Sequence, residues 1–288
     1  MITVVIPVKN RAELVKRTLK SLEQQTRCPA AVVLVDNGST DDTLETLHKW
    51  AKDKPWVKVI TELKPGAAAA RNAGLELVTT PYVMFFDSDD VMPKRHIEQV
   101  CSGLIAAGKA KIAAFDMELT DMNGKVHLKR FRHGDAMRLH IFHSILSTQR
   151  CVLSTELVRS VEGWNDSLPC WNDWEFGLRL LIQEPKVEYI LLDEPVKVYA
   201  QAESITGTNF SSKHGLWERA LDAADLILAN TKYRKLIDYR RAILAGHYRR
   251  EGHREYAKGL TRGLWMKFIE RYVSVGGRGV EYLSRGLD

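Results

Sequence analysis

The sequence predicts an α/β protein in which helices flank a mostly parallel central sheet. Short β-branched runs alternate with helical patterns through the first 110 residues, a spacing typical of parallel sheets. The runs are almost continuously apolar, as expected for strands buried on both faces. Polar and flexible residues follow directly after the runs, at the strand ends where open parallel sheets bind ligands.

Four strands are expected in this first part. The helical patterns between them cover residues 11–25, 39–52 and 66–78. The second pattern begins with acidic residues, which the helix dipole favours in a first turn. The expected strands are "TVVIPV" (3–8), "AVVLVD" (31–36), "WVKVIT" (56–61) and "YVMFF" (82–86).

The pattern changes after residue 110. The stretch 111–131 predicts two strands around an Asn123-Gly124 turn, followed by helical segments that include "WNDWEFGLRLL" (171–181) and by a late strand "VEYILL" (187–192). No linker rich in Pro, Ser or Gly separates the parts. We therefore expect one half at 1–110, a mixed-sheet half at 111–206 that shares its core, and a helical, basic C-terminal extension at 207–288.

Composition is that of an ordinary soluble globular protein, with 45% apolar and 27% charged residues in a chain of 288. No apolar run reaches the roughly 18 residues of a membrane helix, and the N-terminus does not resemble a signal peptide. The four cysteines are scattered without a CxxC pair. These features predict a cytoplasmic protein with reduced thiols, and no disulfide framework or zinc site.

The net charge of +6 is unevenly distributed. Residues 213–288 hold 16 Lys and Arg against 9 Asp and Glu, so this tail carries +7 and the remainder carries −1. A nucleic-acid binder usually concentrates positive charge around its reading site. Since the strand-end site lies in the near-neutral part, nucleic acid is not an expected partner.

Three carboxylates follow the fourth strand within four positions: Asp87, Asp89 and Asp90. Such close negative charges repel one another unless a cation is near. Oxygen ligands suit Mg²⁺ or Mn²⁺, which keep coordination positions open for substrate phosphates. The alternative is an acidic turn in which Asp90 caps the next helix. Arg71, in a small-residue helix start, could pair with a phosphate or with one of these aspartates.

Asp173 lies between two tryptophans in "CWNDWEF". Partly apolar surroundings raise a carboxylate pKa towards the range useful for a general base. The alternative is a carboxylate that serves the helix dipole. Trp164, Trp171 and Trp174 could form a platform for a sugar ring or could belong to the core.

In order along the chain, these segments resemble the inverting nucleotide-sugar glycosyltransferases of family 2, which have the Rossmann-like GT-A fold. "TVVIPVKNR" resembles the opening hhIPxYN strand of that family, "VVLVDNGSTDDT" its hhVDDGSxDxT block and "KPGAAAARNAG" its NxGxxxARNxG segment. "YVMFFDSDDVMPK" resembles the DxD block, and "VEGWNDSLPCWNDWEFGLRLL" resembles the acceptor-side block. The resemblance covers residues 1 to about 206.

The resemblance implies a role for each matching residue. Asp89 would bind Mn²⁺ or Mg²⁺, with Asp87 and Gln201 as further candidate ligands, and Asp173 would be the catalytic base. The donor would be a UDP-sugar, and the acceptor a glycan or a lipid-linked hydroxyl. Residues on the nucleotide side would be Pro7, Lys9, Asn10, Arg11, Asp36, Arg71, Asp87 and Ser88, and residues on the acceptor side would be Trp164, Trp171, Asn172 and Trp174.

Two positions depart from the pattern of the family. Asn37 replaces the second of two paired aspartates, and Gln201, in "VKVYAQAESIT" (196–206), stands where a histidine often completes the metal site. The second departure keeps open a non-catalytic sugar-nucleotide-binding or scaffold protein.

Two enzyme classes with related sequence features fit less well. A haloacid-dehalogenase-type phosphatase also carries the acidic string, but on its first strand. A nucleotidyltransferase would require a Gly-rich loop after the first strand, and "PVKNR" contains no glycine.

The tail carries two amphipathic patterns. Trp217, Leu221, Ala224 and Leu228 share one helical face, and Trp265, Phe268, Ile269 and Tyr272 share another beside Lys267 and Arg271. These faces could pack on the rest of the chain or on a partner subunit in a homo-oligomer. The alternative is a peripheral contact with the inner membrane face.

Overall fold

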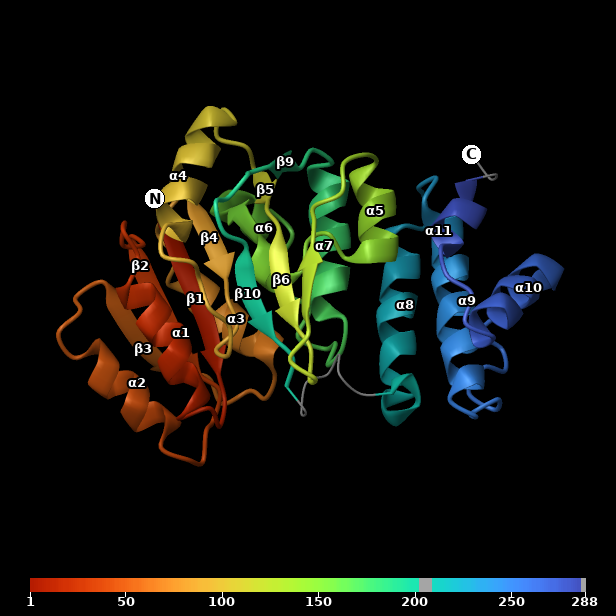
Figure 1. The fold of residues 1–288 in the computed structure, drawn as a ribbon, viewed down its shortest axis with the longest axis horizontal. Coiled ribbons are helices and arrows are strands. Elements are labelled where there is room, and N and C mark those ends of the chain that lie inside the picture. The colour runs from red at the N-terminus through yellow and green to blue at the C-terminus, as the bar shows by residue number, and fades with distance from the viewer. Residues whose placement is uncertain (202–208, 286–288) are drawn as a thin grey trace.

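A seven-stranded sheet forms the centre of the computed structural model, which describes residues 1–201 and 209–285 (Figure 1). The strand order is β3-β2-β1-β4-β8-β5-β9, and all neighbours are parallel except those of β8. This arrangement confirms the α/β prediction. The strands are β1 (Ile2–Val8), β2 (Ala31–Asp36), β3 (Val57–Thr61), β4 (Tyr82–Phe85), β5 (Ile112–Ala114), β8 (Cys151–Ser154) and β9 (Glu188–Tyr189).

Helices cover both faces of the sheet, because successive strand residues point to opposite sides. In β1, Val4 and Ile6 pack with α1, α2 and α4, whereas Val5 packs with α3, α6 and α7. All three side chains are fully buried. The flanking helices are α1 (Leu14–Glu23), α2 (Thr43–Ala51), α3 (Ala67–Glu76), α4 (His96–Ala106), α5 (Ala136–His143), α6 (Thr155–Ser160) and α7 (Asn172–Gln183), with a short 3₁₀ turn η1 (Thr148–Arg150) before β8.

The second half differs in detail from the prediction. The stretch expected as one strand before the hairpin is two, because the chain leaves the main sheet after β5 and forms β6 (Met117–Thr120) in a small second sheet. This sheet has the order β10-β6-β7, with β7 (Val126–Lys129) and β10 (Val196–Tyr199). The hairpin turn is confirmed, and Gly124 has a positive φ of 78° there. The late strand is only two residues long.

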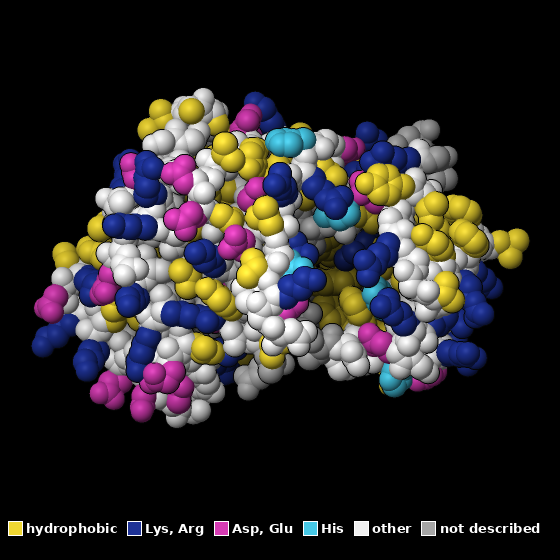
Figure 2. All heavy atoms as spheres, viewed as in Figure 1, with side chains coloured by type: hydrophobic (Ala, Val, Ile, Leu, Met, Phe, Trp, Pro, Cys, Tyr) yellow, Lys and Arg dark blue, Asp and Glu magenta, His cyan; other side chains and the backbone are white. Residues whose placement is uncertain are grey.

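The C-terminal residues form helices that lie beside α5 and α7 (Figure 1). The first of them buries Trp217, Leu221, Ala224 and Leu228, as predicted. On the face shown in Figure 2, hydrophobic side chains gather at the end formed by the last two helices, with Lys and Arg side chains around them. These elements are η2 (Phe210–Lys213), α8 (Leu216–Ile227), α9 (Arg234–Arg250), α10 (Gly263–Ser274) and α11 (Val280–Leu283).

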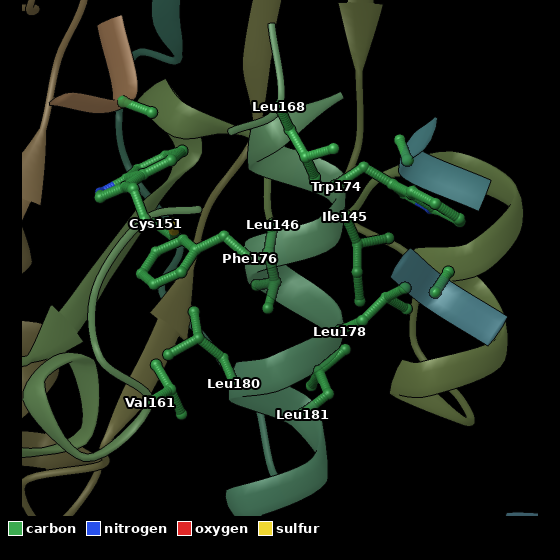
Figure 3. Packing of buried hydrophobic residues seen from close by; sticks show 14 of the residues in the cluster. Ile145, Leu146, Cys151, Val161, Leu168, Trp174, Phe176, Leu178, Leu180 and Leu181 are labelled. Atoms are coloured by element: carbon green, nitrogen blue, oxygen red, sulfur yellow. The ribbon is translucent and has the colours of Figure 1, made fainter. Parts of the chain in front are cut away.

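Helix α7 joins the core of the sheet to the C-terminal helices. Figure 3 shows Phe176 and Leu180 on one side of α7, and Trp174 and Leu178 on the side that faces the blue C-terminal ribbon. One continuous cluster of buried residues therefore includes β-strand, α7 and α8 side chains. None of the helices in residues 1–201 and 209–285 is long and apolar enough to cross a membrane.

Candidate active site

Two loops at the carboxyl ends of β1 and β2 are bonded to each other. The Asn10 amide donates to Ser39 Oγ (3.0 Å), and Asn10 Oδ1 accepts from the Thr40 amide (2.8 Å). The Arg11 amide donates to Thr43 Oγ1 (2.8 Å). Pro7 is buried within β1, whereas the neighbouring Lys9 is exposed. The four residues expected along the nucleotide pocket therefore lie on one edge of the sheet.

Asp36 and Asn37 end β2 and have different environments. Asp36 is 2% exposed, and its Oδ2 accepts from the Ser39 amide (3.1 Å), but its buried Oδ1 has no partner among the described residues. A buried acceptor without a donor is costly, so this atom is suited to a ligand N–H. Asn37, by contrast, has its side-chain amide bonded within the protein: its Nδ2 donates to the carbonyls of Glu62 (2.9 Å) and Lys64 (2.8 Å).

The carboxylates after β4 are not equivalent. Asp87 Oδ1 accepts from Arg71 Nη2 (2.8 Å), and its Oδ2 accepts from Gln149 Nε2. Burial and the charge of Asp87 raise the pKa of Asp89. No hydrogen bond from another side chain reaches the Asp89 carboxylate within the described part of the chain. Ser88, between the two, is buried.

Asp90 does not cap the following helix, contrary to the alternative left open by the sequence. It is 1% exposed, and its Oδ1 accepts from the Tyr199 amide (3.0 Å) of β10, whereas α4 begins six residues later at His96. Burial, with the nearby charges of Asp87 and Asp89, raises the pKa of Asp90 to about 8. Asp90 therefore joins the acidic loop to the small sheet.

Arg17 of α1 is a basic neighbour of this loop that the sequence analysis missed. Its Nη2 donates to the Asp89 carbonyl, and its guanidinium lies 4.2 Å from the centre of the Tyr199 ring. Gln149 of η1 was also missed. The two residues lie 72 and 62 positions from their partners in the acidic loop, and no local pattern marks either of them.

Arg71 is held between the acidic loop and the core. Its guanidinium lies 4.4 Å from the centre of the Trp164 ring and is 5% exposed. The Trp164 ring also stacks on the Phe176 ring, with ring centres 4.4 Å apart. Trp164 is 4% exposed and Trp174 is 1% exposed, so both are core residues and neither offers a ring face to a sugar. For these two, the structure supports the core alternative.

Asp173 lies in the first turn of α7 and is partly exposed. Its Oδ1 accepts from the Trp174 amide (2.8 Å). Burial raises the pKa of Asp173; the charge of Arg71 opposes that rise, and the charge of Asp87 adds to it. Contacts of Arg71 with Asp87 and with the Trp164 ring, which stacks on Phe176 of α7, connect the start of α7 to the acidic loop, although 86 positions separate Asp173 from Asp87 in the chain.

His140 of α5 positions the start of α7. Its Nδ1 accepts from the Leu146 amide (3.2 Å), so the ring proton is on Nε2, which donates to the Trp174 carbonyl (2.8 Å). Burial lowers the pKa of His140 to about 4, so the ring stays neutral. The sequence analysis missed this residue because its partner lies 34 positions away.

The other acceptor-side candidates lie where α7 meets the tail. Trp171, half-buried and with a left-handed φ of 52°, packs on Trp217 with ring centres 4.9 Å apart. The Arg240 guanidinium of α9 lies 4.7 Å from the centre of the Trp171 ring. Asn172 is half-buried, and its Nδ2 donates to the Leu168 carbonyl (3.5 Å).

Gln201 follows β10, and its Nε2 donates to the Tyr199 carbonyl (3.4 Å). The rest of the segment compared with the family histidine motif, 202–206, lies outside the described residues. Among residues 1–201 and 209–285, no three His, Cys, Asp or Glu side chains are grouped closely enough to hold a metal ion.

A profile of the family described as Glycosyl transferase family 2 matches residues 3–148, slightly more than half of the chain. The chain belongs to glycosyltransferase family 2. The matched residues include the ends of β1, β2 and β4, so the family assignment covers the edge of the sheet described above.

Curated relatives of this family 2 chain align with part of it. An uncharacterized glycosyltransferase, YibD, of Escherichia coli K12 is 34% identical over 89 residues, which are 31% of this chain and 26% of the relative. Validoxylamine A glucosyltransferase of Streptomyces hygroscopicus subsp. limoneus is 32% identical over 116 residues, 39% of this chain and 25% of the relative. The aligned segment thus spans about a quarter of each of these relatives.

Solved structures match nearly the whole family 2 chain. Staphylococcus aureus TarS 1–349 in complex with UDP-GlcNAc superposes with a TM-score of 0.66 at 18% identity, over 94% of this chain and 79% of that structure. The mannosyltransferase PcManGT of Pyrobaculum calidifontis, in complex with GDP-Man and Mn²⁺, gives a TM-score of 0.60 at 16% identity, over 99% and 79%. At these identities the likeness shows the fold, which is of the GT-A type.

Proposed function

We propose that the protein is an inverting glycosyltransferase that moves a sugar from a nucleoside-diphosphate donor, a UDP-sugar, to an acceptor hydroxyl. Family membership supports transfer of a sugar. The observation that supports this mechanism is the packing that links α7 to the acidic loop. Arg71 pairs with Asp87 (2.8 Å) and lies over the Trp164 ring, which stacks on Phe176, three positions after Asp173 in α7. The base and the donor site would then share this region.

The donor nucleotide would lie over the carboxyl ends of β1, β2 and β4. Asp36 Oδ1, a buried acceptor that no donor reaches from residues 1–201 and 209–285, would take an N–H of the base. Pro7, Lys9, Asn10 and Arg11 would line the pocket. Asp87 would contact the nucleoside from a carboxylate that Arg71 and Gln149 already orient, and Ser88 would lie beside it.

The residues present fit a divalent cation with few protein ligands. Asp87 has hydrogen-bond donors on both oxygens, whereas the Asp89 carboxylate has none from other side chains in the described part of the chain. Asp89 would therefore be the principal ligand of Mn²⁺ or Mg²⁺, with water and donor phosphates in the remaining positions. When bound, the cation would stabilise the negative charge of the departing nucleoside diphosphate.

The chain's own groups would perform the proton transfer. Asp173 would accept the proton of the acceptor hydroxyl while that oxygen forms a bond to the anomeric carbon of the sugar. Attack on the face opposite the leaving diphosphate inverts the configuration at that carbon. His140 would keep the start of α7, and with it Asp173, in place through its bond to the Trp174 carbonyl.

For the acceptor we propose a glycan or a lipid-linked sugar reached from the cytoplasm. Trp171 and Asn172 remain candidates for acceptor contact, because both are half-buried next to Asp173. We assign Trp164 and Trp174 to the core and not to the acceptor site, because both are buried.

The deciding experiment combines donor binding with turnover. Asp173→Asn should bind UDP in the presence of Mn²⁺ with unchanged affinity, while UDP release from UDP-sugars falls about 10²- to 10⁴-fold, the usual contribution of a general base. Asp53→Asn, an exposed aspartate beyond α2, is the matched control and should behave as wild type. Equal turnover in all three proteins would overturn the assignment of Asp173.

The cation is tested separately by calorimetry. Mn²⁺ should strengthen UDP binding to the wild type and have no effect on Asp89→Asn. A scaffold or sugar-nucleotide-binding protein of the same fold, the remaining alternative, would bind UDP but show no transfer or hydrolysis with any UDP-sugar.

A further inference from the structure

Helix α10 presents a hydrophobic face to solvent. Leu264 is 88% exposed, Phe268 is 51% exposed and Trp265 is 46% exposed. The opposite face of the helix is buried: Ile269 and Val273 pack in a small cluster with α9 residues. Of the residues that the sequence pattern groups on one helical face, Ile269 is therefore buried, whereas Trp265 and Phe268 are exposed. Figure 2 shows the exposed hydrophobic side chains at this end of the molecule.

The aromatic side chains on this face are ordered by their neighbours. Trp265 Nε1 donates to the hydroxyl of Tyr239 (2.8 Å), which is fully buried in α9. The Trp265 and Phe268 rings stack with centres 5.2 Å apart, and Phe268 and Tyr272 stack at 6.3 Å. Since the rings are already fixed, burying them in a new environment costs little side-chain entropy.

Beside these rings lies a pocket of about 470 Å³ with positive charge. It is lined by Lys258, Lys267 and Arg271, all exposed, and no ion pair involves them in the described part of the chain. The acidic residue of the pocket, Glu270, is 3% exposed and bonds to Arg249 and to Thr261 Oγ1 (2.5 Å). Its charge is thus already compensated, which leaves three cations for a ligand.

We infer that α10 docks the protein peripherally on a bilayer that contains anionic phospholipids. Leu264, Trp265 and Phe268 would enter the boundary between headgroups and acyl chains, and the pocket would hold a headgroup phosphate. An exposed apolar ridge flanked by Lys and Arg is the pattern of interfacial helices. Each basic residue near an anionic surface adds attraction. The unpaired positive charges of Lys267 and Arg271 beside the apolar ridge complement an anionic surface, whereas a second copy of this face would bring more positive charge.

The test is co-sedimentation of the full chain with vesicles of phosphatidylcholine alone or mixed with phosphatidylglycerol. The wild type should sediment with the mixed vesicles, weakly with the neutral ones, and less as salt increases. Phe268→Ser should weaken binding to the mixed vesicles about tenfold. The double variant Lys267→Gln, Arg271→Gln should lower the affinity for these vesicles about fivefold for each charge removed. Because all three side chains are exposed, melting temperatures should not change.

Matched controls carry the same changes elsewhere. Leu226→Ser, on an 81% exposed leucine of α8, and Lys49→Gln of α2 should bind vesicles as the wild type does. Absence of sedimentation, equal binding to both vesicle types, or unchanged binding of Phe268→Ser would overturn the inference. So would a dimer in solution that Phe268→Ser dissociates. No transfer reaction is measured, so the result is independent of the proposed function.

Discussion

At the scale of single residues, Asn37 has a structural role that an aspartate could not take. Its amide donates to the carbonyls of Glu62 and Lys64, and its Oδ1 accepts from the Gly66 amide (2.8 Å). An aspartate, the usual residue at this position, cannot donate to two carbonyls. The departure from the motif therefore holds the β3–α3 loop next to the end of β2.

Asn37→Asp should accordingly destabilise the protein by about 1–3 kcal/mol, because a buried carboxylate would face two carbonyl oxygens. Chemical denaturation of both proteins measures the difference. Asn123→Asp, at the exposed hairpin tip, is the control and should change stability by less than about 0.5 kcal/mol. Equal stability of Asn37→Asp and the wild type would mean that the loop does not depend on this amide.

Asp173 leads to a prediction for pH dependence. Its pKa is raised by burial, so the protonated, inactive form of the base persists to a higher pH than for an ordinary aspartate, whose pKa is about 4. The kcat/KM of transfer should therefore be constant at high pH and fall as the pH decreases through this raised pKa. Measurement of kcat/KM across a pH series gives the pH at which activity falls on the acidic side. A fall in kcat/KM centred on the ordinary aspartate pKa would show that a group other than Asp173 titrates.

Residues of the candidate site can be proposed from the sequence where they end or follow a strand, and not where they come from distant segments. Asp36 ends β2, Asp87 and Asp89 follow β4, and strand ends can be read from apolar runs. Gln149 and Arg17 contact the acidic loop across 62 and 72 positions, and only the three-dimensional fold brings them there. The buried bond between Asp90 and the Tyr199 amide is of the same kind.

At the scale of elements, the junction of α5 and α7 depends on a glycine. A Cβ at Gly177 would lie 2.3 Å from His140 Nε2, the atom that donates to the Trp174 carbonyl. Gly177→Ala should therefore displace the imidazole and cost about 1–3 kcal/mol of stability. Thermal denaturation measures the loss.

The control is a double-mutant cycle. In a His140→Ala background there is no ring to displace, so Gly177→Ala should cost clearly less there. Additive effects of the two changes would contradict the proposed contact.

Other elements show where periodicity loses information. The break between β5 and β6 was missed because apolar residues continue on both sides of Asp116, from Ile112–Ala114 and Phe115 to Met117 and Leu119. Asp116 marks the break, and its Oδ1 accepts from the Phe131 amide (2.7 Å). In α10 the apolar residues were seen correctly, but their pattern does not say which of them face α9. That choice depends on α9, a partner that a local pattern does not identify.

At the scale of the whole molecule, the C-terminal helices complete the main core. Trp217 of α8 is 2% exposed, packs against the tilted ring of Trp171 and donates from Nε1 to the Phe210 carbonyl (2.9 Å). Trp217→Ala should cost about 3–5 kcal/mol, as for other buried aromatic truncations. Leu226→Ala on the solvent side of the same helix should cost less than about 0.5 kcal/mol. Denaturation curves of both variants test this contrast, and equal effects would mean that α8 packs only loosely.

The shared cluster beneath α7 and α8 has a practical consequence for protein engineering. A chimera that takes its donor-binding region from this chain and its last helices from a relative would inherit mismatched surfaces along α7. A chimera should therefore fold only if α7 and the C-terminal helices come from the same parent protein. The junction between the two parents should lie before α7 and not after β10.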